Sequence, residues 1–338
     1  MTSAAREKKF YVWDTYWDTN QVYSFGIDNQ PRVAATLANF WAWLSGALPP
    51  GSNVLDVACG NGAAALILSR AAKKAGRPMT VTGIDEAAID PVRTVPEHAT
   101  DLAEITFRPR VAMEDLPFPD ASFDAVISQF GFEFGNPAAG LMEAARVIKT
   151  NGTLAVLALP SGSVAVNAAR KSLKQARFLL AESGLFDSAL TMIREYYAAP
   201  GDVAEEKLQA ELADFSKAVE KMFNRFDESE IGILSVIVSC LYKIFADRKT
   251  AQADVQLAAI ETARTRLAHY AARDQAIIKA AVPDGNLWPF RPALLAAGFA
   301  LTDSRAVLAQ GHGILAFQII AVRLPPKAPP PAPPQQPA

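Results

Sequence analysis

Several features that would indicate particular classes of protein are scarce in this chain of 338 residues. Its two cysteines, Cys59 and Cys240, do not suggest a disulfide framework. Its three histidines are widely separated and give no metal-ligand spacing, so no metal site is expected. The most apolar run, residues 231–242, is too short to span a bilayer, which needs about 20 residues.

Strong charge of one sign is also absent. The net charge is -2, and lysine and arginine are scattered without forming a basic stripe. Double-stranded nucleic acid usually requires such a stripe, so a nucleic-acid partner is not expected and a small molecule is favoured. Residues 1–9 are polar and charged with no apolar segment after them, which predicts no signal peptide and a cytoplasmic location.

The remaining composition is that of a globular protein, 50% hydrophobic and 20% charged. The chain is organised around residues 53–65. Val54, Leu55 and Val57 predict a buried strand, Gly60-Asn61-Gly62 breaks it, and an alanine- and leucine-rich helix follows. A strand, a glycine turn and a helix open nucleotide-type α/β folds, because the turn lets a ligand approach the backbone at the helix N-terminus.

Three interpretations of this turn are open. A dinucleotide site would use Gly-x-Gly-x-x-Gly, but the third position here is Ala65. S-adenosylmethionine would instead place its amino-acid end at the turn, and its ammonium group suits Asp56, whose charge would repel a pyrophosphate. A turn that binds nothing is the third.

A second strand is predicted over residues 79–85, and it ends in Asp85, 23 residues after Gly62. An acidic side chain at that spacing is suited to bind the two hydroxyls of an adenosine ribose. The alternative is that Asp85 caps a helix predicted over residues 86–89.

Two ordered motifs carry a family resemblance. The first is Asp56-x-Ala-Cys-Gly-x-Gly62, and the second is the acidic pair Glu114-Asp115 followed by Leu-Pro-Phe-Pro-Asp-x-Ser-Phe-Asp. Together they resemble class I S-adenosylmethionine-dependent methyltransferases, and the second is similar to the ubiquinone/menaquinone-biosynthesis type. The resemblance implies S-adenosylmethionine as cofactor and the following binding residues: Asp56, Ala58, Gly60, Asn61, Gly62, Asp85, Glu86, Met113, Glu114, Asp115, Gln129 and Phe130.

The resemblance also suggests roles within that set. Glu114 or Asp115 would accept from the adenine amine, Met113 would cover a face of its ring, and Gln129 and Phe130 would line the pocket near the sulfonium. Residues 132–134 would face the acceptor. The Asn/Asp-Pro-Pro-aromatic sequence of amino-directed nucleic-acid methyltransferases is absent here. Glu133 is the candidate catalytic residue, as a base or as a ligand of an acceptor amine; the alternative is that it caps the turn or faces solvent.

The expected fold class is α/β: a Rossmann-like, seven-stranded, mostly parallel sheet whose last strand is antiparallel, with a helical insertion. A helix is predicted over residues 137–149, a fifth strand over 154–159, and a helix capped by Asp202 in the insertion. The predicted domains follow in chain order: aromatic-rich N-terminal helices (1–48), the cofactor-binding core (49–162), a helical cap (163–285), the end of the sheet (286–324) and a proline-rich disordered tail (325–338).

The acceptor side is less defined. The apolar cap suits an aromatic or lipophilic small molecule, although such stripes also suit a plain packing layer or a homodimer interface. Residues 10–48 hold four of the five tryptophans, which predicts helices packed on the sheet, with aromatic residues near Tyr23 and Phe25 closing the pocket. Eight of the last fourteen residues are proline.

The predicted function is in-line SN2 methyl transfer from S-adenosylmethionine to an O, N, C or S nucleophile of a small molecule. Positioning would supply most of the catalysis. An NAD(P)-dependent oxidoreductase, a non-catalytic S-adenosylmethionine-binding protein and transfer of a group other than methyl are the alternatives.

Overall fold

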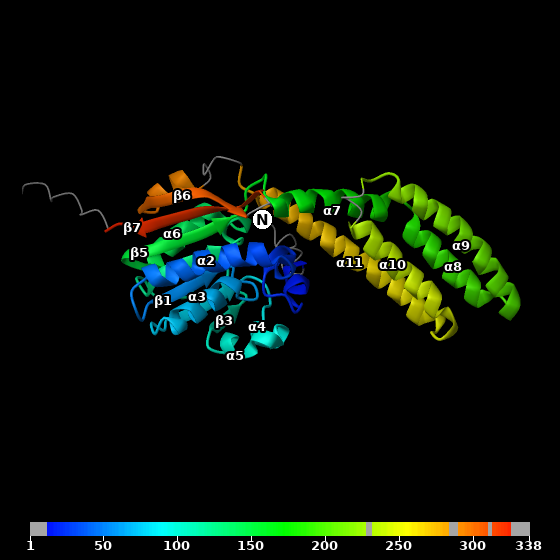
Figure 1. Ribbon diagram of the computed structural model, residues 1–338, viewed down its shortest axis with the longest axis horizontal. Helices are drawn as coiled ribbons and strands as arrows, with labels where there is room; N and C mark the ends of the chain where they lie inside the picture. The colour runs from blue at the N-terminus through cyan, green and yellow to red at the C-terminus, as the bar shows by residue number, and fades with distance from the viewer. Residues whose placement is uncertain (1–11, 228–231, 284–289, 310–312, 326–338) are drawn as a thin grey trace, which may run out of the picture. The chain divides into compact units, whose positions relative to one another are not determined.

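The structure, a computed structural model, describes residues 12–227, 232–283, 290–309 and 313–325. The chain divides into two compact units, one of residues 1–164 with 280–338 and one of residues 165–279. The first unit contains all seven strands, and the second consists of helices (Figure 1). No helix among the described residues is long and apolar enough to cross a membrane.

One sheet forms the centre of the first unit, with the strand order β3-β2-β1-β4-β5-β7-β6. Its strands are β1 (Asn53–Val57), β2 (Thr80–Asp85), β3 (Thr106–Pro109), β4 (Phe123–Gln129), β5 (Ile148–Ala158), β6 (Phe299–Ala309) and β7 (Gly313–Arg323). Strands β1 to β5 pair in parallel, whereas β7 pairs antiparallel with both β5 and β6. The predicted mostly parallel sheet with an antiparallel last strand is confirmed.

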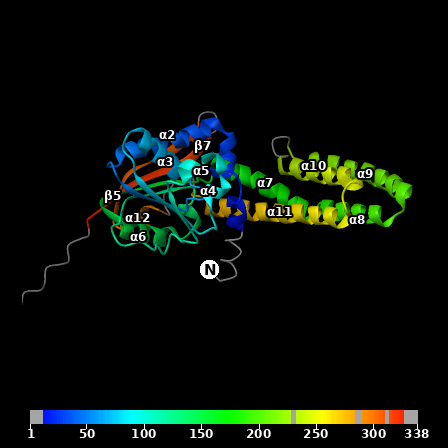
Figure 2. The ribbon, with the colours of Figure 1, turned by 90° about the horizontal axis from the view of Figure 1, so that it is seen from below.

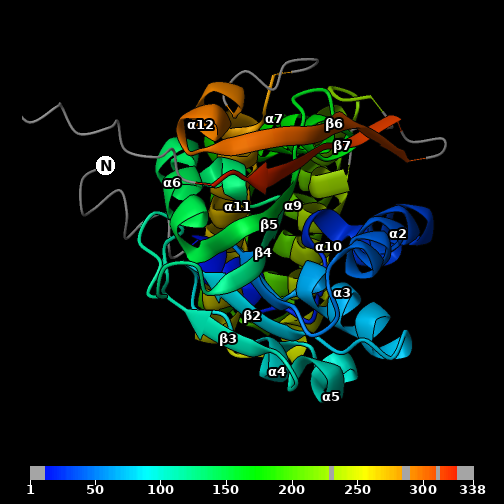
Figure 3. The same cartoon turned by 90° about the vertical axis from the view of Figure 1, so that its left-hand side faces the viewer.

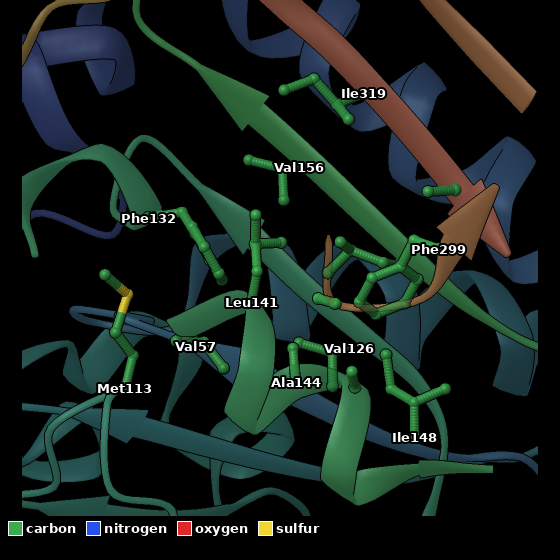
Figure 4. Packing of buried hydrophobic residues seen from close by; sticks show 14 of the residues in the cluster. Val57, Met113, Val126, Phe132, Leu141, Ala144, Ile148, Val156, Phe299 and Ile319 are labelled. Atoms are coloured by element: carbon green, nitrogen blue, oxygen red, sulfur yellow. The ribbon is translucent and has the colours of Figure 1, made fainter. Parts of the chain in front are cut away.

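Helices cover both faces of this sheet, as its apolar strands require. Helices α2 (Pro31–Ala47) and α3 (Ala63–Lys74) lie on one face, and α6 (Pro137–Val147) and α12 (Arg291–Ala296) lie on the other (Figure 3). Between the sheet and α6, the side chains of Val126, Leu141 and Phe132 pack together, with Val156 and Phe299 nearby (Figure 4). This buried layer holds the carboxyl ends of the central strands in place.

Short elements connect the strand ends. They are η1 (Ser24–Asn29), α4 (Pro91–Thr94), η2 (Pro96–His98), α5 (Ala99–Leu102) and η3 (Phe132–Phe134). Residues 12–17 are helical as well. Helix α4 begins where Asp90 accepts a hydrogen bond from the amide of Arg93 and Pro91 takes the first helical position.

The helical unit joins the first unit after β5 and before β6. Its elements are α7 (Val164–Ala181), α8 (Leu185–Ala198), α9 (Gly201–Phe223), α10 (Gly232–Ala246), η5 (Asp247–Lys249) and α11 (Ala253–Ala280), visible in Figure 2. One face of α9 is apolar and is buried at Leu208, Phe215, Val219 and Met222. These side chains belong to an apolar core that the helices of this unit form among themselves.

Two local predictions about helices were wrong, and one helix was missed. Residues 86–89 are not helical, because the Asp85 carboxylate accepts a hydrogen bond from the amide of Ala87 within the turn. The next helix, α4, begins at Pro91. Asp202 does not cap α9, which begins one residue earlier, at Gly201 after Pro200. Helix α8 was not predicted separately.

Strand β5 begins earlier than the predicted fifth strand and is irregular at residues 149–152. Ile148 already pairs with Phe123, and Thr153 pairs with Ala125, so the residues between them form a bulge. Asn151 adopts a positive φ of 64° there, which asparagine tolerates better than most residues. The strand therefore starts six residues earlier than predicted. Residues 310–312, which connect β6 to β7, lie outside the described residues.

Candidate functional site

The carboxyl ends of β1, β2 and β4 lie side by side, since β1 pairs with both of its neighbours. The backbone is tightly folded at this edge. Ala58 and Phe130, which follow β1 and β4, both adopt positive φ values, 53° and 54°. A Cβ added to Gly131 would lie 2.5 Å from the Cβ of Ala58, so the two loops approach each other closely. Non-glycine residues with such φ values concentrate at functional sites.

Asp85 lies at the end of β2 in this edge. Its two carboxylate oxygens accept hydrogen bonds from the amides of Gly60 and Ala87, each at 2.8 Å. The side chain is buried, yet it lines the larger of two neighbouring pockets, a cavity of about 80 Å³. The glycine turn and the β2 carboxylate, which the sequence predicted to cooperate, are therefore directly bonded.

Asp56, at the end of β1, is buried next to a second, smaller pocket of about 20 Å³. Its Oδ2 atom accepts from the amide of Ala65 at 3.2 Å, whereas Oδ1 has no hydrogen-bond partner among the described residues. Burial, with a contribution from the charge of Asp85, raises the pKa of Asp56 to about 8. Asp56 therefore retains its proton at neutral pH unless a cation lies beside it.

The larger pocket collects several residues that the sequence proposed. Glu86, Met113 and Glu114 line it, together with Asp85 and Ala58. Glu114 also accepts from the amide of Asn136 at 2.6 Å, and this bond links its loop to the start of α6. Asp115, in contrast, has an exposed side chain and is not part of the lining of either pocket.

Gln129 and Phe130 line the smaller pocket, and Phe130 lines the larger one as well. The Oε1 atom of Gln129 accepts from the indole nitrogen of Trp41 on α2 at 2.6 Å. Trp41, on a helix that covers one face of the sheet, therefore holds the end of β4 in place.

Aromatic side chains from residues 12–30 cover the site. Trp13 and Trp17 line the larger pocket, and Trp13 contacts Phe134 edge-on with ring centroids 5.1 Å apart. The Trp17 ring lies directly over Gly60, where an added Cβ would collide with it. Sequence reasoning expected the closure near Tyr23 and Phe25. Phe25 does pack against Phe130, but the pocket-lining rings of Trp13 and Trp17 were missed, whereas Phe134 belongs to the segment that was expected to face the acceptor. The only sign of these rings in the sequence was the high density of aromatic residues in this segment.

Polar contacts attach this segment to the core. The Asn61 side-chain amide donates to the carbonyl oxygens of Trp17, Thr19 and Gln21 at 3.1, 3.2 and 2.8 Å. Asp14 accepts from the amide of Ala88 at 2.7 Å and pairs with Arg110 at 2.7 Å. Asn61, Gly60 and Gly62 are absent from the lining of both pockets, so their observed role is to shape and clamp the turn.

Glu133 is not part of the lining of either pocket, although its neighbour Phe134 lines the larger one. Its buried carboxylate accepts from the amide of Leu159, just after β5, at 2.8 Å. Its Oε2 atom has no hydrogen-bond partner within the described part of the chain. Burial raises the pKa of Glu133 to about 7.

Asp56 and Asp85 each suit a different end of S-adenosylmethionine. The unpartnered oxygen of Asp56 suits an ammonium group, and Asp85 in the larger pocket suits ribose hydroxyls. The present cavities are small, however, because ligands of this size occupy pockets of about 300 Å³ or more. The Trp17 ring covers the backbone of the turn at Gly60.

Residues 55–156 match the family model described as a methyltransferase domain. This segment is a methyltransferase domain. It contains the last three residues of β1, all of β2 to β4 and most of β5, and therefore both acidic residues of the site. The resemblance recognised in the sequence is confirmed, and S-adenosylmethionine is the cofactor of the domain.

Curated relatives resemble the methyltransferase domain and its surroundings. A ubiquinone/menaquinone biosynthesis C-methyltransferase of Geotalea daltonii is 32% identical over 144 residues, covering 41% of this chain and 55% of that protein. A demethylmenaquinone methyltransferase of Tropheryma whipplei is 34% identical over 158 residues, 46% and 59% of the two chains. A 2-methyl-6-phytyl-1,4-hydroquinone methyltransferase of Synechocystis is 40% identical over 113 residues, 32% of each. The chain spans less than two thirds of the length of these relatives.

Proposed function

We propose that this chain transfers a methyl group from S-adenosylmethionine to a nucleophilic O, N, C or S atom of a small molecule, by in-line SN2 displacement. The observation that carries the proposal is the placement of two carboxylates at the ends of adjacent strands. Asp85 lines the larger pocket, Asp56 presents an unpartnered oxygen beside the smaller one, and Ala58 lies in the lining of both. The two polar ends of one elongated cofactor would be bound in this way.

Each residue then has a definite task. Asp56 would accept from the ammonium group, and Asp85 would accept from the ribose hydroxyls. Met113 and Glu114 would contact the adenine, one with its apolar side chain and one as an acceptor. When bound, the cofactor supplies a methyl group already activated by a positively charged sulfur. Because of that activation, the protein has mainly to position the acceptor and exclude water.

Exclusion of water would be the task of the aromatic residues. Trp13, Trp17 and Phe134 line the larger pocket, and Trp17 and Phe130 also line the smaller one. Rings at these positions also offer their faces to a cation such as a sulfonium. We propose that the acceptor is an aromatic or lipophilic molecule, because the wall available to it is aromatic. The relatives named for ubiquinone/menaquinone and hydroquinone substrates agree with that class.

We propose a positioning role for Glu133 instead of the general-base role considered from the sequence. Its bound oxygen fixes η3 to the backbone after β5, and it does not line either pocket. Methyl transfer from a sulfonium does not require a dedicated base when the acceptor is already nucleophilic. Replacement by glutamine would preserve the acceptor for Leu159 and should leave turnover within about twofold.

The experiment that tests this function is product detection. The full chain would be incubated with S-adenosylmethionine and a panel of phenols, hydroquinones and lipophilic amines. Mass spectrometry should then reveal S-adenosylhomocysteine together with an acceptor that is 14 mass units heavier, the difference of one CH₂ group. The Asp85→Asn variant is the negative control. A non-catalytic binding protein would give neither product with any acceptor, and transfer of a different group would give a different mass increase.

A further inference from the structure

The smaller pocket offers a carboxylate but no cationic side chain. Asp56 lines it, and no lysine, arginine or histidine among the described residues does so. The amino-acid end of S-adenosylmethionine is a zwitterion, which carries a carboxylate as well as the ammonium group that Asp56 suits. A carboxylate removed from water requires hydrogen-bond donors, and in this pocket the donors have to be neutral groups.

Gln129 is one such group, and a contact from α2 determines how its amide is turned. Gln129 is the last residue of β4 and lines the smaller pocket. The indole nitrogen of Trp41 lies 2.6 Å from its Oε1 atom. Because an indole N–H can only donate, the atom that faces it must be the amide oxygen and not the amide nitrogen. The contact therefore fixes which end of the Gln129 amide lies against α2.

The nitrogen of the same amide remains available at the pocket. The Nε2 atom of Gln129 forms no hydrogen bond within the part of the chain that the structure describes. An amide nitrogen carries two donor hydrogens, which suits an anionic ligand. Trp41 is fully buried, and its ring packs edge-on against Phe40 with centroids 4.7 Å apart, so the indole itself is held in place.

We propose that Trp41 is a positioning residue: by holding the oxygen of the Gln129 amide, it directs Nε2 to donate to the carboxylate of the cofactor's amino-acid end. This inference rests on the proposed function and adds to it a reason for selectivity. Asp56 binds the ammonium group from the end of β1, and Gln129 binds the carboxylate from the end of β4. The site thereby favours a nucleoside that carries a complete amino acid over one that has lost its carboxylate.

Other neutral donors at the same pocket complete the carboxylate's surroundings. The hydroxyl group of Ser24 lines the pocket, as do Ala63 and Ala64 in the first turn of α3. Amides in the first turn of a helix have no intrahelical acceptor and carry the positive end of the helix dipole. These donors are fixed by the backbone, whereas the donor of Gln129 depends on Trp41.

The alternative is that the bond between Trp41 and Gln129 only joins α2 to the sheet. The two roles differ in their consequences for ligands. A structural link affects every ligand of the site alike, whereas a carboxylate donor matters only to a ligand that has a carboxylate. Comparing two ligands that differ in this one group therefore separates the two roles.

Titration calorimetry on the full chain would compare S-adenosylhomocysteine with its decarboxylated analogue, which keeps the amine. The wild type should bind S-adenosylhomocysteine about ten- to a hundredfold more tightly, as expected for hydrogen bonding to a charged group. Gln129→Glu keeps an acceptor for Trp41 but places a negative charge against the ligand carboxylate, so this preference should disappear or reverse. Any effect of the new charge on Asp56 acts on the amine that both ligands share, and it cancels in the comparison.

Trp41→Phe tests the positioning role itself, because it removes the indole donor and keeps an aromatic ring. The Gln129 amide is then free to turn, and the preference should decrease by about two- to tenfold, as for loss of a neutral hydrogen bond. Trp43→Phe is the matched control on the same helix. Trp43 is 51% exposed and lines neither pocket, so this variant should keep the wild-type preference.

The outcomes are distinct. A preference that keeps its wild-type value in Gln129→Glu, whether or not both ligands bind more weakly, would overturn the proposal. This comparison decides alone if Trp41→Phe does not fold. A wild type that binds both ligands equally would overturn this inference and leave the proposed function standing, whereas a wild type that binds neither ligand would overturn both.

Discussion

Binding of the cofactor should release a proton from the carboxyl group of Asp56. Burial raises the pKa of Asp56 to about 8, so at pH 6.5 its carboxyl group is almost entirely protonated in the free protein. An ammonium group beside the unpartnered Oδ1 favours the ionised form. Each bound molecule should therefore release close to one proton at pH 6.5.

The cost of this ionisation follows from the same shift. Holding the carboxylate ionised at pH 6.5, about 1.5 units below its pKa, costs about 2 kcal/mol. The cost decreases as the pH rises towards 8, so the contribution of Asp56 makes binding about tenfold stronger per pH unit in this range. Above pH 8 the gain levels off, because Asp56 is then already ionised and the ligand's own amine begins to lose its proton.

Calorimetry with S-adenosylhomocysteine at pH 6.5, in buffers of different ionisation enthalpy, measures the proton release. The wild-type protein should release about one proton, and the Asp56→Asn variant should release none. Asp303→Asn, a change of the same kind on β6, lies outside both pockets and should behave as wild type. A wild-type protein that binds without releasing a proton would refute the assignment of Asp56 to the ammonium group.

Three further predictions concern the surroundings of the site. Trp17→Ala should accelerate cofactor association in stopped-flow measurements by about tenfold, if the ring that covers Gly60 contributes about 1.4 kcal/mol to the opening barrier; an unchanged rate would show that Trp17 does not gate entry. Gly131→Ala should weaken cofactor binding, because its Cβ would lie 2.5 Å from the Ala58 Cβ and separate the two loops; unchanged affinity in a folded variant would contradict this. Glu133→Gln should flatten the pH dependence of the free energy of unfolding. In the folded wild type Glu133 keeps its proton up to a pKa of about 7, so the free energy of unfolding should fall by on the order of 2–3 kcal/mol between pH 4.5 and 7. Denaturant titrations at several pH values measure this change.

The sequence predicted the acidic residues of the central strands correctly as neighbours. The reason is geometric, because residues at the carboxyl ends of adjacent parallel strands must meet at one edge of the sheet. Asp85 and the Gly60 amide therefore come together, although they are 25 positions apart. The strand order and the antiparallel last strand followed from the same family pattern.

The direction in which loop side chains point could not be predicted from the sequence. Glu114 and Asp115 are adjacent and chemically alike, yet Glu114 lines the pocket and binds the start of α6 while Asp115 is exposed. The order of residues in a loop does not determine which of two neighbours points inward. Glu133 illustrates the same limit, since a 3-10 turn directs it towards the amide of Leu159.

The covering segment was the least predictable part. Trp17 reaches Gly60 from 43 positions upstream, held by contacts to Asn61 and by ion pairs of Asp14 and Asp18. Each contact is specific to this arrangement and has no periodic signature in the sequence. Aromatic enrichment could indicate that the segment packs near the site, but it could not assign the individual rings.

The most direct test compares two carboxylates of the cofactor-binding set proposed from the sequence. Titration calorimetry with S-adenosylhomocysteine would be performed on Asp85→Asn and on Asp115→Asn, each checked for folding by thermal denaturation. A charge-assisted hydrogen bond is worth about 1.5–3 kcal/mol, so Asp85→Asn should weaken binding about ten- to a hundredfold, and Asp115→Asn should remain close to wild type. Wild-type affinity in the Asp85 variant would contradict the placement of the ribose in the larger pocket.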